Sequence, residues 1–422
     1  MVQRYYIETL GCPKNQVDSD KIAGKLIADG LVATEDASKA DVVVVNTCAF
    51  IEEARKESID TMLSLDDTRK RSSRLIVTGC MAERYGDELA EALPEADQVA
   101  GFGVPLQLTR KPIAVTGEIP KFDLLNLPRP KSTSPWAYVK IAEGCDRSCG
   151  FCAIPSFRGP QRSRDVASIL TEVEQLEVRE VVLIAQDLAS YGKDRPDELG
   201  AGSIVQLVRD VAAMADWVRL LYLYPSDLSD ELIDAILDTG VPYFDLSLQH
   251  ASKEHLRRMK RWGDGPRFLE RIARIRTLSP DAAFRSNFIV GYPGETEEDH
   301  DQLLSFVRDA QLDWCGFFAF SPEDGTHALT LSNRVEEGLM NERLAELREL
   351  QDSISAERRD LLLGETIEVL VDEPGIARSF REAPEIDGVV QVPEHLEVGR
   401  FHTVVVEQVF GPDLIATEAP GK

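Results

Sequence analysis

The sequence has no long hydrophobic run. None of its apolar stretches reaches the ~18 residues that a membrane-spanning helix needs. Its first residues, MVQRYYIETLGC, also lack the basic segment followed by an apolar segment that is typical of a signal peptide. From these two absences we expect a cytoplasmic protein that does not act on a membrane.

Positive charge is also scarce. Among the 422 residues, 47 are Lys or Arg and 73 are Asp or Glu, which gives a formal net charge of −26. A field of this sign repels nucleic acid at long range and favours basic partners. Solubility by itself could also explain an acidic composition. The charge therefore favours a basic partner without requiring one.

The first part of the chain alternates strands with helices. We expect strands at 5–8, 42–45 and 75–77, and helices at 17–28, 52–65 and 85–93. The run Val42–Val45 is continuously β-branched, as a strand buried on both faces requires. The pattern predicts a doubly wound α/β domain over residues 1–125, followed by a linker rich in Pro and Ser.

The alternation resumes from Trp136 over a longer stretch. Helical segments such as 166–176 and 228–237 separate six expected strands, at 137–141, 181–185, 218–224, 244–248, 284–290 and 314–320. Six such units predict an incomplete TIM-type (β/α)6 barrel over residues 131–363, whose active site would lie at the carboxyl ends of its strands.

The C-terminal part has a different pattern. A helix is expected at 336–363, and four short strands follow it at 366–371, 389–392, 403–409 and 414–417, with Gly and Pro between them. This pattern predicts a small all-β, OB-like barrel over residues 364–422. The fold class is therefore α/β with an appended β barrel.

The strongest chemical signal is the segment EGCDRSCGFC at 143–152. The chain has seven cysteines, and an odd number in a long chain favours metal binding or catalysis over a disulfide framework. Cys145, Cys149 and Cys152 follow the first barrel strand with a spacing that can surround one face of a compact metal centre. Thiolates suit zinc or an iron–sulfur cluster. A zinc site needs a fourth ligand, and no cysteine or nearby histidine follows to supply it.

A second group of cysteines is scattered along the sequence. Cys12, Cys48 and Cys80 each come just after an expected strand of the first domain. The carboxyl ends of parallel strands converge on one crevice in a doubly wound sheet, so these thiols are expected to meet and to hold a second cluster. Three buried cysteines that serve only as small apolar residues are the alternative.

The motif C-x-x-x-C-x-F-C at 145–152 resembles the signature of the radical S-adenosylmethionine (SAM) superfamily. The resemblance implies that Cys145, Cys149 and Cys152 hold a 4Fe–4S cluster with one open iron that binds SAM. One electron then cleaves SAM to a 5′-deoxyadenosyl radical, which abstracts hydrogen from an unactivated carbon. The cofactor carries this chemistry, and the protein positions it and excludes water.

Over its whole length the chain resembles the methylthiotransferase family. The resemblance is closest to the branch that modifies a ribosomal protein, on the stretches TLGCPKNQVDS (9–19), IPSFRG (154–159), SPEDGT (321–326) and APEIDG (383–388). It implies a radical SAM barrel between an N-terminal domain, in which Cys12, Cys48 and Cys80 hold an auxiliary 4Fe–4S cluster, and a C-terminal TRAM domain. It also implies methylthiolation at the β-carbon of an aspartate in small-subunit ribosomal protein twelve, with electrons from a donor such as flavodoxin or ferredoxin.

Several barrel residues are candidates for the SAM pocket. They lie in the cysteine motif or at strand ends, where a TIM-type barrel binds its ligands: Phe151, Gln186, Asp187, Ser247, Gln249, Gly291 and Glu295. Ordinary barrel filling or a simple strand-to-helix turn would explain the last six equally well.

The C-terminal domain bears on the choice of partner. Residues 365–422 contain twelve acidic side chains and four basic ones. A domain that binds RNA needs Lys and Arg to displace counterions from phosphates. RNA binding is therefore not expected to be the main role of this C-terminal domain. We expect its acids, including Glu382, Glu385 and Asp387, to attract a basic protein. A tRNA adenosine methylthiotransferase and a non-enzymatic iron–sulfur or zinc protein that binds RNA remain the alternatives.

Overall fold

The computed structural model describes residues 2–106, 108, 123–200 and 202–420. Their contacts form two compact units. The first unit comprises residues 1–131, 142–147 and 153–164, and the second comprises 132–141, 148–152 and 165–422. The sequence predicts three domains, with boundaries at 125, 131 and 364, whereas the contacts divide the chain into two units. The three-domain boundaries therefore stay a prediction. Residues 109–122 of the predicted first domain lie outside the described residues.

The first unit contains a parallel five-stranded sheet in the order β2-β1-β3-β4-β5. This is the strand order of flavodoxin-like doubly wound sheets, so the predicted α/β domain is confirmed. The strands are β1 (Arg4–Thr9), β2 (Val32–Ala33), β3 (Val42–Thr47), β4 (Arg74–Gly79) and β5 (Gln98–Ala100), and the helices are α1 (Pro13–Ala28), α2 (Glu52–Thr68) and α3 (Cys80–Ala92).

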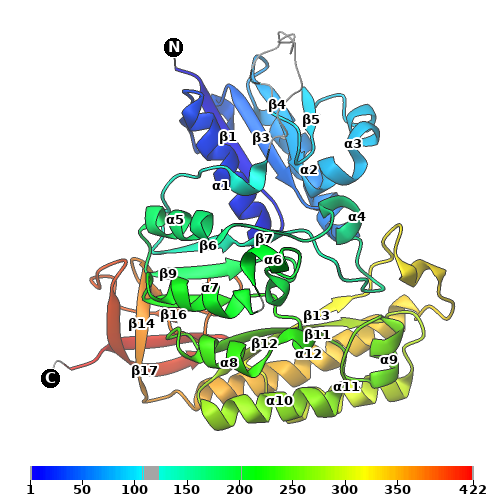
Figure 1. Cartoon of the computed structure of the whole chain (residues 1–422), viewed down its shortest axis with the longest axis vertical. Helices are drawn as coiled ribbons and strands as arrows, with labels where there is room; N and C mark the ends of the chain where they lie inside the picture. The colour runs from blue at the N-terminus through cyan, green and yellow to red at the C-terminus, as the bar shows by residue number, and fades with distance from the viewer. Residues whose placement is uncertain (1, 107, 109–122, 201, 421–422) are drawn as a thin grey trace. The chain divides into compact units, whose positions relative to one another are not determined.

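The sheet is covered on both faces because alternate residues of a strand point to opposite sides. On β3, Val42 and Val44 pack with Ile22 of α1. Val43 and Val45 pack instead in the core that contains residues of α2 and α3. Figure 1 shows these helices around the sheet. The continuous valine run is explained by this double burial.

The second unit contains six parallel strands. They form two three-stranded sheets, in the orders β10-β9-β6 and β11-β12-β13, and a bridge between Leu223 and Leu246 joins the two. No pairing between β13 and β6 closes the ring among the described residues, so the predicted incomplete barrel is confirmed. The strands are β6 (Trp136–Lys140), β9 (Glu180–Ile184), β10 (Trp217–Leu220), β11 (Tyr243–Gln249), β12 (Ala283–Val290) and β13 (Trp314–Ala319).

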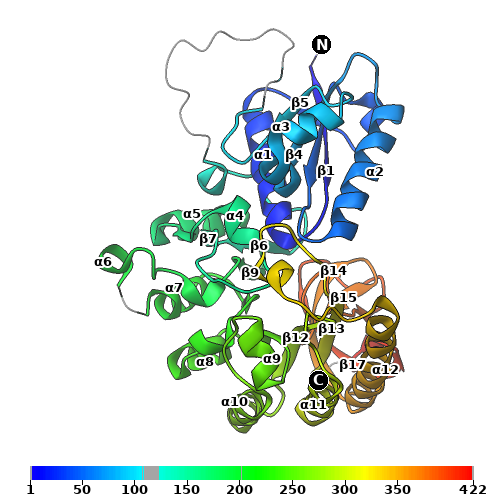
Figure 2. The same ribbon diagram turned by 90° about the vertical axis from the view of Figure 1, so that its right-hand side faces the viewer.

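Helices follow these strands in sequence. α10, α11 and α12 lie beside one another in both views (Figure 1; Figure 2). The longer helices are α5 (Val166–Leu176), α7 (Ser203–Ala212), α8 (Asp230–Leu237), α10 (Gly265–Leu278), α11 (Glu297–Ala310) and α12 (Glu337–Asp360), and the shorter ones are α4 (Ile154–Arg158), α6 (Pro196–Leu199) and α9 (Lys253–Arg258). A β ladder of two short strands, β7 (Ala142–Glu143) and β8 (Arg162–Ser163), belongs to the first unit.

The chain ends in a closed five-stranded β barrel, as the sequence predicts. Its order is β14-β15-β16-β18-β17. The strands are β14 (Thr366–Glu373), β15 (Ile376–Arg378), β16 (Val390–Gln391), β17 (Phe401–Phe410) and β18 (Asp413–Glu418). Its interior is filled by apolar residues such as Val369 and Val404, both fully buried.

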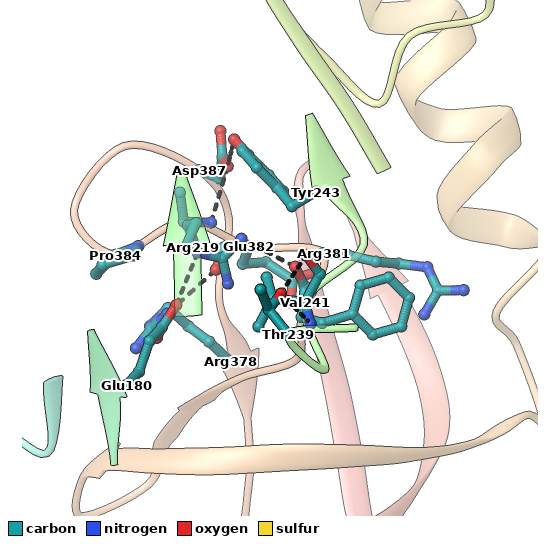
Figure 3. A network of polar contacts seen from close by, with 12 residues as sticks. Glu180, Arg219, Thr239, Val241, Tyr243, Arg378, Arg381, Glu382, Pro384 and Asp387 are labelled. Carbon is teal, nitrogen blue, oxygen red and sulfur yellow. Dashed lines mark hydrogen bonds and ion pairs between the residues drawn. The ribbon is translucent and has the colours of Figure 1, made fainter. Parts of the chain in front are cut away.

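A buried polar network joins this small barrel to the parallel strands (Figure 3). Glu180, the first residue of β9, accepts hydrogen bonds of 2.7 Å from Arg219 Nε and from Arg378 Nη1. All three side chains are at most 2% exposed. Burial alone would raise the pKa of Glu180, but the two guanidinium groups outweigh burial and hold it below its usual range.

The loop between β15 and β16 completes the junction. Backbone oxygens of this loop accept hydrogen bonds from Arg219 (to Phe380, 2.9 Å) and Trp314 (to Arg381, 2.7 Å). Tyr138 donates to the Pro384 carbonyl at 2.9 Å. Glu180 and Trp314 are the first residues of β9 and β13, so the small barrel covers the amino ends of the parallel strands. In TIM-type barrels the chemistry lies at the opposite ends.

Two acids of this loop correct an expectation from the sequence. Glu382 pairs with Arg359 at 2.5 Å, and Asp387 accepts a 2.6 Å hydrogen bond from Tyr243 and pairs with Arg285. Both acidic side chains are fully buried. The prediction that they belong to a surface for a basic partner is wrong, because both are paired inside the junction, whereas Glu385 is exposed.

The described part of the chain contains no helix that is both long and apolar enough to cross a membrane.

Candidate metal centres

Three cysteines follow three neighbouring strands of the N-terminal sheet. Cys12 is the N-cap of α1 after β1, Cys48 comes directly after β3, and Cys80 is the first residue of α3 after β4. β1, β3 and β4 are adjacent in the sheet, so all three thiols lie at its carboxyl edge. The gap between β1 and β3 is the switch point at which sheets of this order bind their ligands.

The thiols are close enough to interact electrostatically. Burial, together with the nearby charges of Cys80 and Cys12, raises the pKa of Cys48 to about 12. Burial also raises the pKa of Cys80. For Cys12 burial acts in the same direction, but the positive charges of Lys14 and Arg158 outweigh it and lower the pKa. Without a cation Cys48 and Cys80 are therefore neutral thiols, and a metal centre bound by them would deprotonate both.

Close backbone packing leaves no room for side chains beside the thiols. A Cβ added at Gly11, which has a φ of +98°, would lie 2.9 Å from Cys48 Sγ. A Cβ added at Gly79, with a φ of +91°, would lie 2.5 Å from the Thr47 carbonyl oxygen. The left-handed backbone and the close approach both require glycine before two of the three cysteines.

A buried asparagine braces the loops that carry the cysteines. Asn15 donates from Nδ2 to the carbonyl oxygens of Leu10, at 2.7 Å, and Thr47, at 3.1 Å. Those residues precede Cys12 and Cys48. Thr47 in turn donates to the Thr78 carbonyl at 2.6 Å, close to Cys80. One set of hydrogen bonds therefore fixes all three strand ends before any metal is bound.

The spacing of these thiols does not match a single ion. Sulfurs that bind one tetrahedral zinc, at about 2.3 Å from the metal, lie about 4 Å apart. Among the described residues, the group whose three ligand atoms lie within 4.8 Å of one another is His250, His255 and Glu295, not the cysteine trio. In a cluster each cysteine binds a different iron, so wider spacing is accepted. The three thiol donors therefore suit an iron–sulfur cluster better than a single zinc ion.

The second trio is divided between the two units. Cys145 belongs to the first unit, where its backbone N–H donates to the Gly159 carbonyl at 3.1 Å and its Sγ accepts from the Arg147 N–H at 3.4 Å. Gly144, with a φ of +82°, lies so close to Pro160 that a Cβ would be 2.1 Å from its carbonyl oxygen. This close packing fixes the backbone on which Cys145 is presented.

Cys149 and Cys152 belong to the second unit. Gly150, between them, donates to the Met259 carbonyl at 2.7 Å and accepts from the Ala328 N–H at 2.8 Å. Arg261 donates to Cys149 Sγ at 3.4 Å and also to the Ser247 carbonyl, and its guanidinium lies 4.0 Å from the centre of the Tyr224 ring. Cys149 is thus held near the carboxyl end of β11, and the Gly150 backbone bonds fix the chain between the two cysteines.

The predicted SAM-pocket residues all lie in this second unit. Ser247 and Gln249 are half-buried and alternate with buried leucines at the end of β11, where Gln249 has a φ of +71°. Gln186 follows β9, and Asp187, which is 3% exposed, accepts a 2.8 Å hydrogen bond from Ser190. Phe151 is half-buried in the cysteine loop. Their contact with SAM stays a prediction.

Gly291 and Glu295 form a closed turn after β12. Gly291 N–H donates to Glu295 Oε2 at 2.6 Å, and Arg343 donates to Glu295 Oε1 at 3.0 Å. Because each carboxylate oxygen of Glu295 accepts one of these hydrogen bonds, the side chain stabilises the turn. Its contact with SAM also stays a prediction.

The buried group of His250, His255 and Glu295 is not assigned a metal. Burial lowers the pKa of both histidines, to about 4 for His255, so both rings are neutral at physiological pH. Glu295 already accepts from Gly291 and Arg343. A cation here would face the Arg343 guanidinium.

Sequence reasoning missed the side chains that hold the cysteines. Arg158, Arg261, Asn15 and Glu143 were not singled out, although Arg158 lies in the quoted stretch IPSFRG and Glu143 begins the cysteine segment. Arg158 and Asn15 interact across 143 residues of sequence, and local patterns carry no signal for such a contact.

Three family models match the chain. Residues 4–101 match "Uncharacterized protein family UPF0004", residues 139–307 match the radical SAM superfamily and residues 363–418 match the TRAM domain.

Curated relatives match over nearly the whole chain. The "Ribosomal protein uS12 methylthiotransferase RimO" of Moorella thermoacetica is 41% identical, with 96% of this chain and 97% of the relative covered. The protein of the same name from Streptomyces avermitilis is 40% identical, with 98% and 96% covered.

A solved structure shares the fold at low identity. The radical S-adenosylmethionine methyltransferase TsrM from Kitasatospora setae matches with a TM-score of 0.50 and 13% identity, covering 83% of this chain and 91% of that one. At this identity the match supports the fold alone.

Proposed function

Because the chain belongs to the RimO family of radical SAM methylthiotransferases, we propose that it inserts a methylthio group at the β-carbon of an aspartate of ribosomal protein uS12. The observation that carries this proposal is identity of about 40% over the full length of relatives that bear this name. The convergence of Cys12, Cys48 and Cys80 at one sheet edge supports it, because this reaction needs a second sulfur-rich centre in addition to the one that cleaves SAM.

We propose separate roles for the two trios. Cys145, Cys149 and Cys152 hold the cluster that binds SAM, and Cys12, Cys48 and Cys80 hold the auxiliary cluster. When bound, SAM at a reduced cluster supplies a radical able to remove hydrogen from the substrate carbon. The protein's own residues supply position: Arg261 and the Gly150 backbone hold Cys149, and Asn15 holds the loops of Cys12 and Cys48.

The proposed partners follow from the same assignment. A basic substrate protein suits the net charge of −26, and a low-potential donor such as flavodoxin or ferredoxin would supply electrons. The reaction would take place in the cytoplasm, where ribosomes are assembled.

Mass spectrometry tests the substrate directly. Protein uS12 from cells that carry the gene should contain a peptide heavier by one methylthio group in place of hydrogen, with the modification on an aspartate. Cells without the gene should lack it. Unmodified uS12 together with gene-dependent methylthiolated tRNA would instead identify the tRNA-modifying activity.

A further inference from the structure

One arginine contacts the auxiliary cysteine site from a distant part of the sequence. Arg158 is the last residue of α4, and its side chain is 3% exposed. Its Nη2 donates to Cys80 Sγ at 3.0 Å and to Asn15 Oδ1 at 2.7 Å. Asn15 also holds the loops before Cys12 and Cys48. The same Nη2 group of Arg158 therefore contacts the Cys80 thiol and the side chain that positions the other two cysteines.

The other edge of the guanidinium is fixed by two carboxylates. Arg158 Nη1 donates to Asp18 Oδ2 at 3.1 Å and to Glu143 Oε1 at 2.9 Å. The Phe102 ring centre lies 4.3 Å from the guanidinium carbon. A planar fork with fixed donors satisfies all of these partners at once, whereas the single ammonium of lysine cannot.

Glu143 links Arg158 to the segment that carries Cys145. It lies two residues before Cys145 in the segment EGC, and all the residues bound by Arg158 belong to the first compact unit. The same guanidinium therefore connects a ligand of one proposed cluster with the backbone that presents the first ligand of the other.

We infer that Arg158 is a positioning residue that sets the reduction potential of the auxiliary cluster through its hydrogen bond to Cys80. The inference rests on the proposed assignment of that cluster to Cys12, Cys48 and Cys80. Hydrogen bonds to the sulfurs and nearby charge are the protein's means of tuning an iron–sulfur potential. A positive donor favours the more negative, reduced cluster, so Arg158 raises the potential.

A purely structural ion pair is the alternative reading of the same contacts. In that case Arg158 would fix Asp18 and Glu143, and its loss would lower stability without changing the electronic state of the cluster. A measured potential separates the two readings, because a structural role does not move it.

The test uses full-length protein in which Cys145, Cys149 and Cys152 are replaced by alanine, so that the auxiliary cluster is studied alone. After anaerobic reconstitution, iron and sulfide are counted and the midpoint potential is measured by redox titration followed by electron paramagnetic resonance. The variants are Arg158→Met, which removes charge and donors, and Arg158→Lys, which keeps the charge without the fork. Arg162→Met is the control, since Arg162 is 57% exposed and pairs with Asp123 at 3.2 Å.

We expect a more negative potential in Arg158→Met, a smaller shift in the same direction in Arg158→Lys, and an unchanged potential in Arg162→Met. If Arg158→Met does not fold, Arg158→Lys decides, and a potential equal to that of the parent protein would overturn the inference. Failure of the parent protein itself to hold a cluster with Arg158 intact would instead overturn the proposed auxiliary site.

Discussion

At the scale of single residues, Glu180 balances two buried arginines at the junction of the parallel strands and the C-terminal barrel (Figure 3). Replacing Glu180 by Gln keeps the shape of the side chain and removes its charge. Arg219 and Arg378 would then lie buried without the negative charge of Glu180. Removing one partner of a buried ion pair lowers the free energy of unfolding by about 3–5 kcal/mol. We expect a clearly lower denaturation midpoint in urea.

The matched control for this prediction is Glu198→Gln. Glu198 pairs with Arg195 on the surface, and its side chain is 64% exposed. Its replacement should leave the midpoint close to that of the wild type. Equal midpoints for Glu180→Gln and the wild type would show that the junction does not depend on this carboxylate.

A buried histidine predicts how stability depends on pH. Burial lowers the pKa of His255 to about 4, from an ordinary value near 6.5. The unfolded chain therefore takes up the proton first, and stability is complete above pH 6.5 and falls as the pH drops towards 4. Between neutral pH and about pH 5, His255 alone accounts for a loss of about 2 kcal/mol.

The variant His255→Leu should weaken this acid sensitivity, because neither ring nitrogen of His255 has a hydrogen-bond partner among the described residues. Thermal unfolding measured near neutral pH and near pH 5 would show a smaller difference than in the wild type. His395→Gln, at an exposed position, should behave like the wild type. An acid response of the leucine variant identical to that of the wild type would contradict the assigned role of His255.

At the scale of helices and strands, local patterns in the sequence predicted most elements. The valine run of β3 matches its observed burial on both faces. Helix starts were less accurate: α3 begins at Cys80 instead of 85, and α1 begins at Pro13 instead of 17. Proline at the first helical position already has the backbone angle that a helix needs, so Pro13 marks the true start.

Elements held by distant partners were missed. β2 and β5 have two and three residues, too few for a periodic signal, and they exist because β1 and β4 pair with them. The placement of Cys12 and Cys48 after strands could be expected from sequence. The contacts of Arg158 could not, because they join residues that only the fold brings together.

The loop between β15 and β16 gives a prediction at this scale. Deleting residues 364–420 should do more than remove a binding domain, because it exposes Arg219, Arg285 and Trp314 and leaves Glu180 without Arg378. We expect low soluble yield and early thermal unfolding of the remaining chain. A truncated chain that unfolds at the wild-type temperature would contradict the importance of the junction.

At the scale of the whole molecule, the two cysteine trios are proposed to carry different chemistry. The barrel, with the small β barrel at the amino ends of its strands, leaves the opposite ends of those strands for the SAM-cleaving site. The N-terminal sheet brings the other trio to its own carboxyl edge. Radical generation and sulfur transfer should therefore be separable by mutation.

The most direct measurement counts 5′-deoxyadenosine and methylthiolated uS12 in the same anaerobic reactions. The wild type should form both products. A variant with Cys12, Cys48 and Cys80 replaced by alanine should still form 5′-deoxyadenosine but no methylthiolated uS12, and a variant with Cys145, Cys149 and Cys152 replaced by alanine should form neither. Equal loss of 5′-deoxyadenosine in both variants would contradict the division of roles.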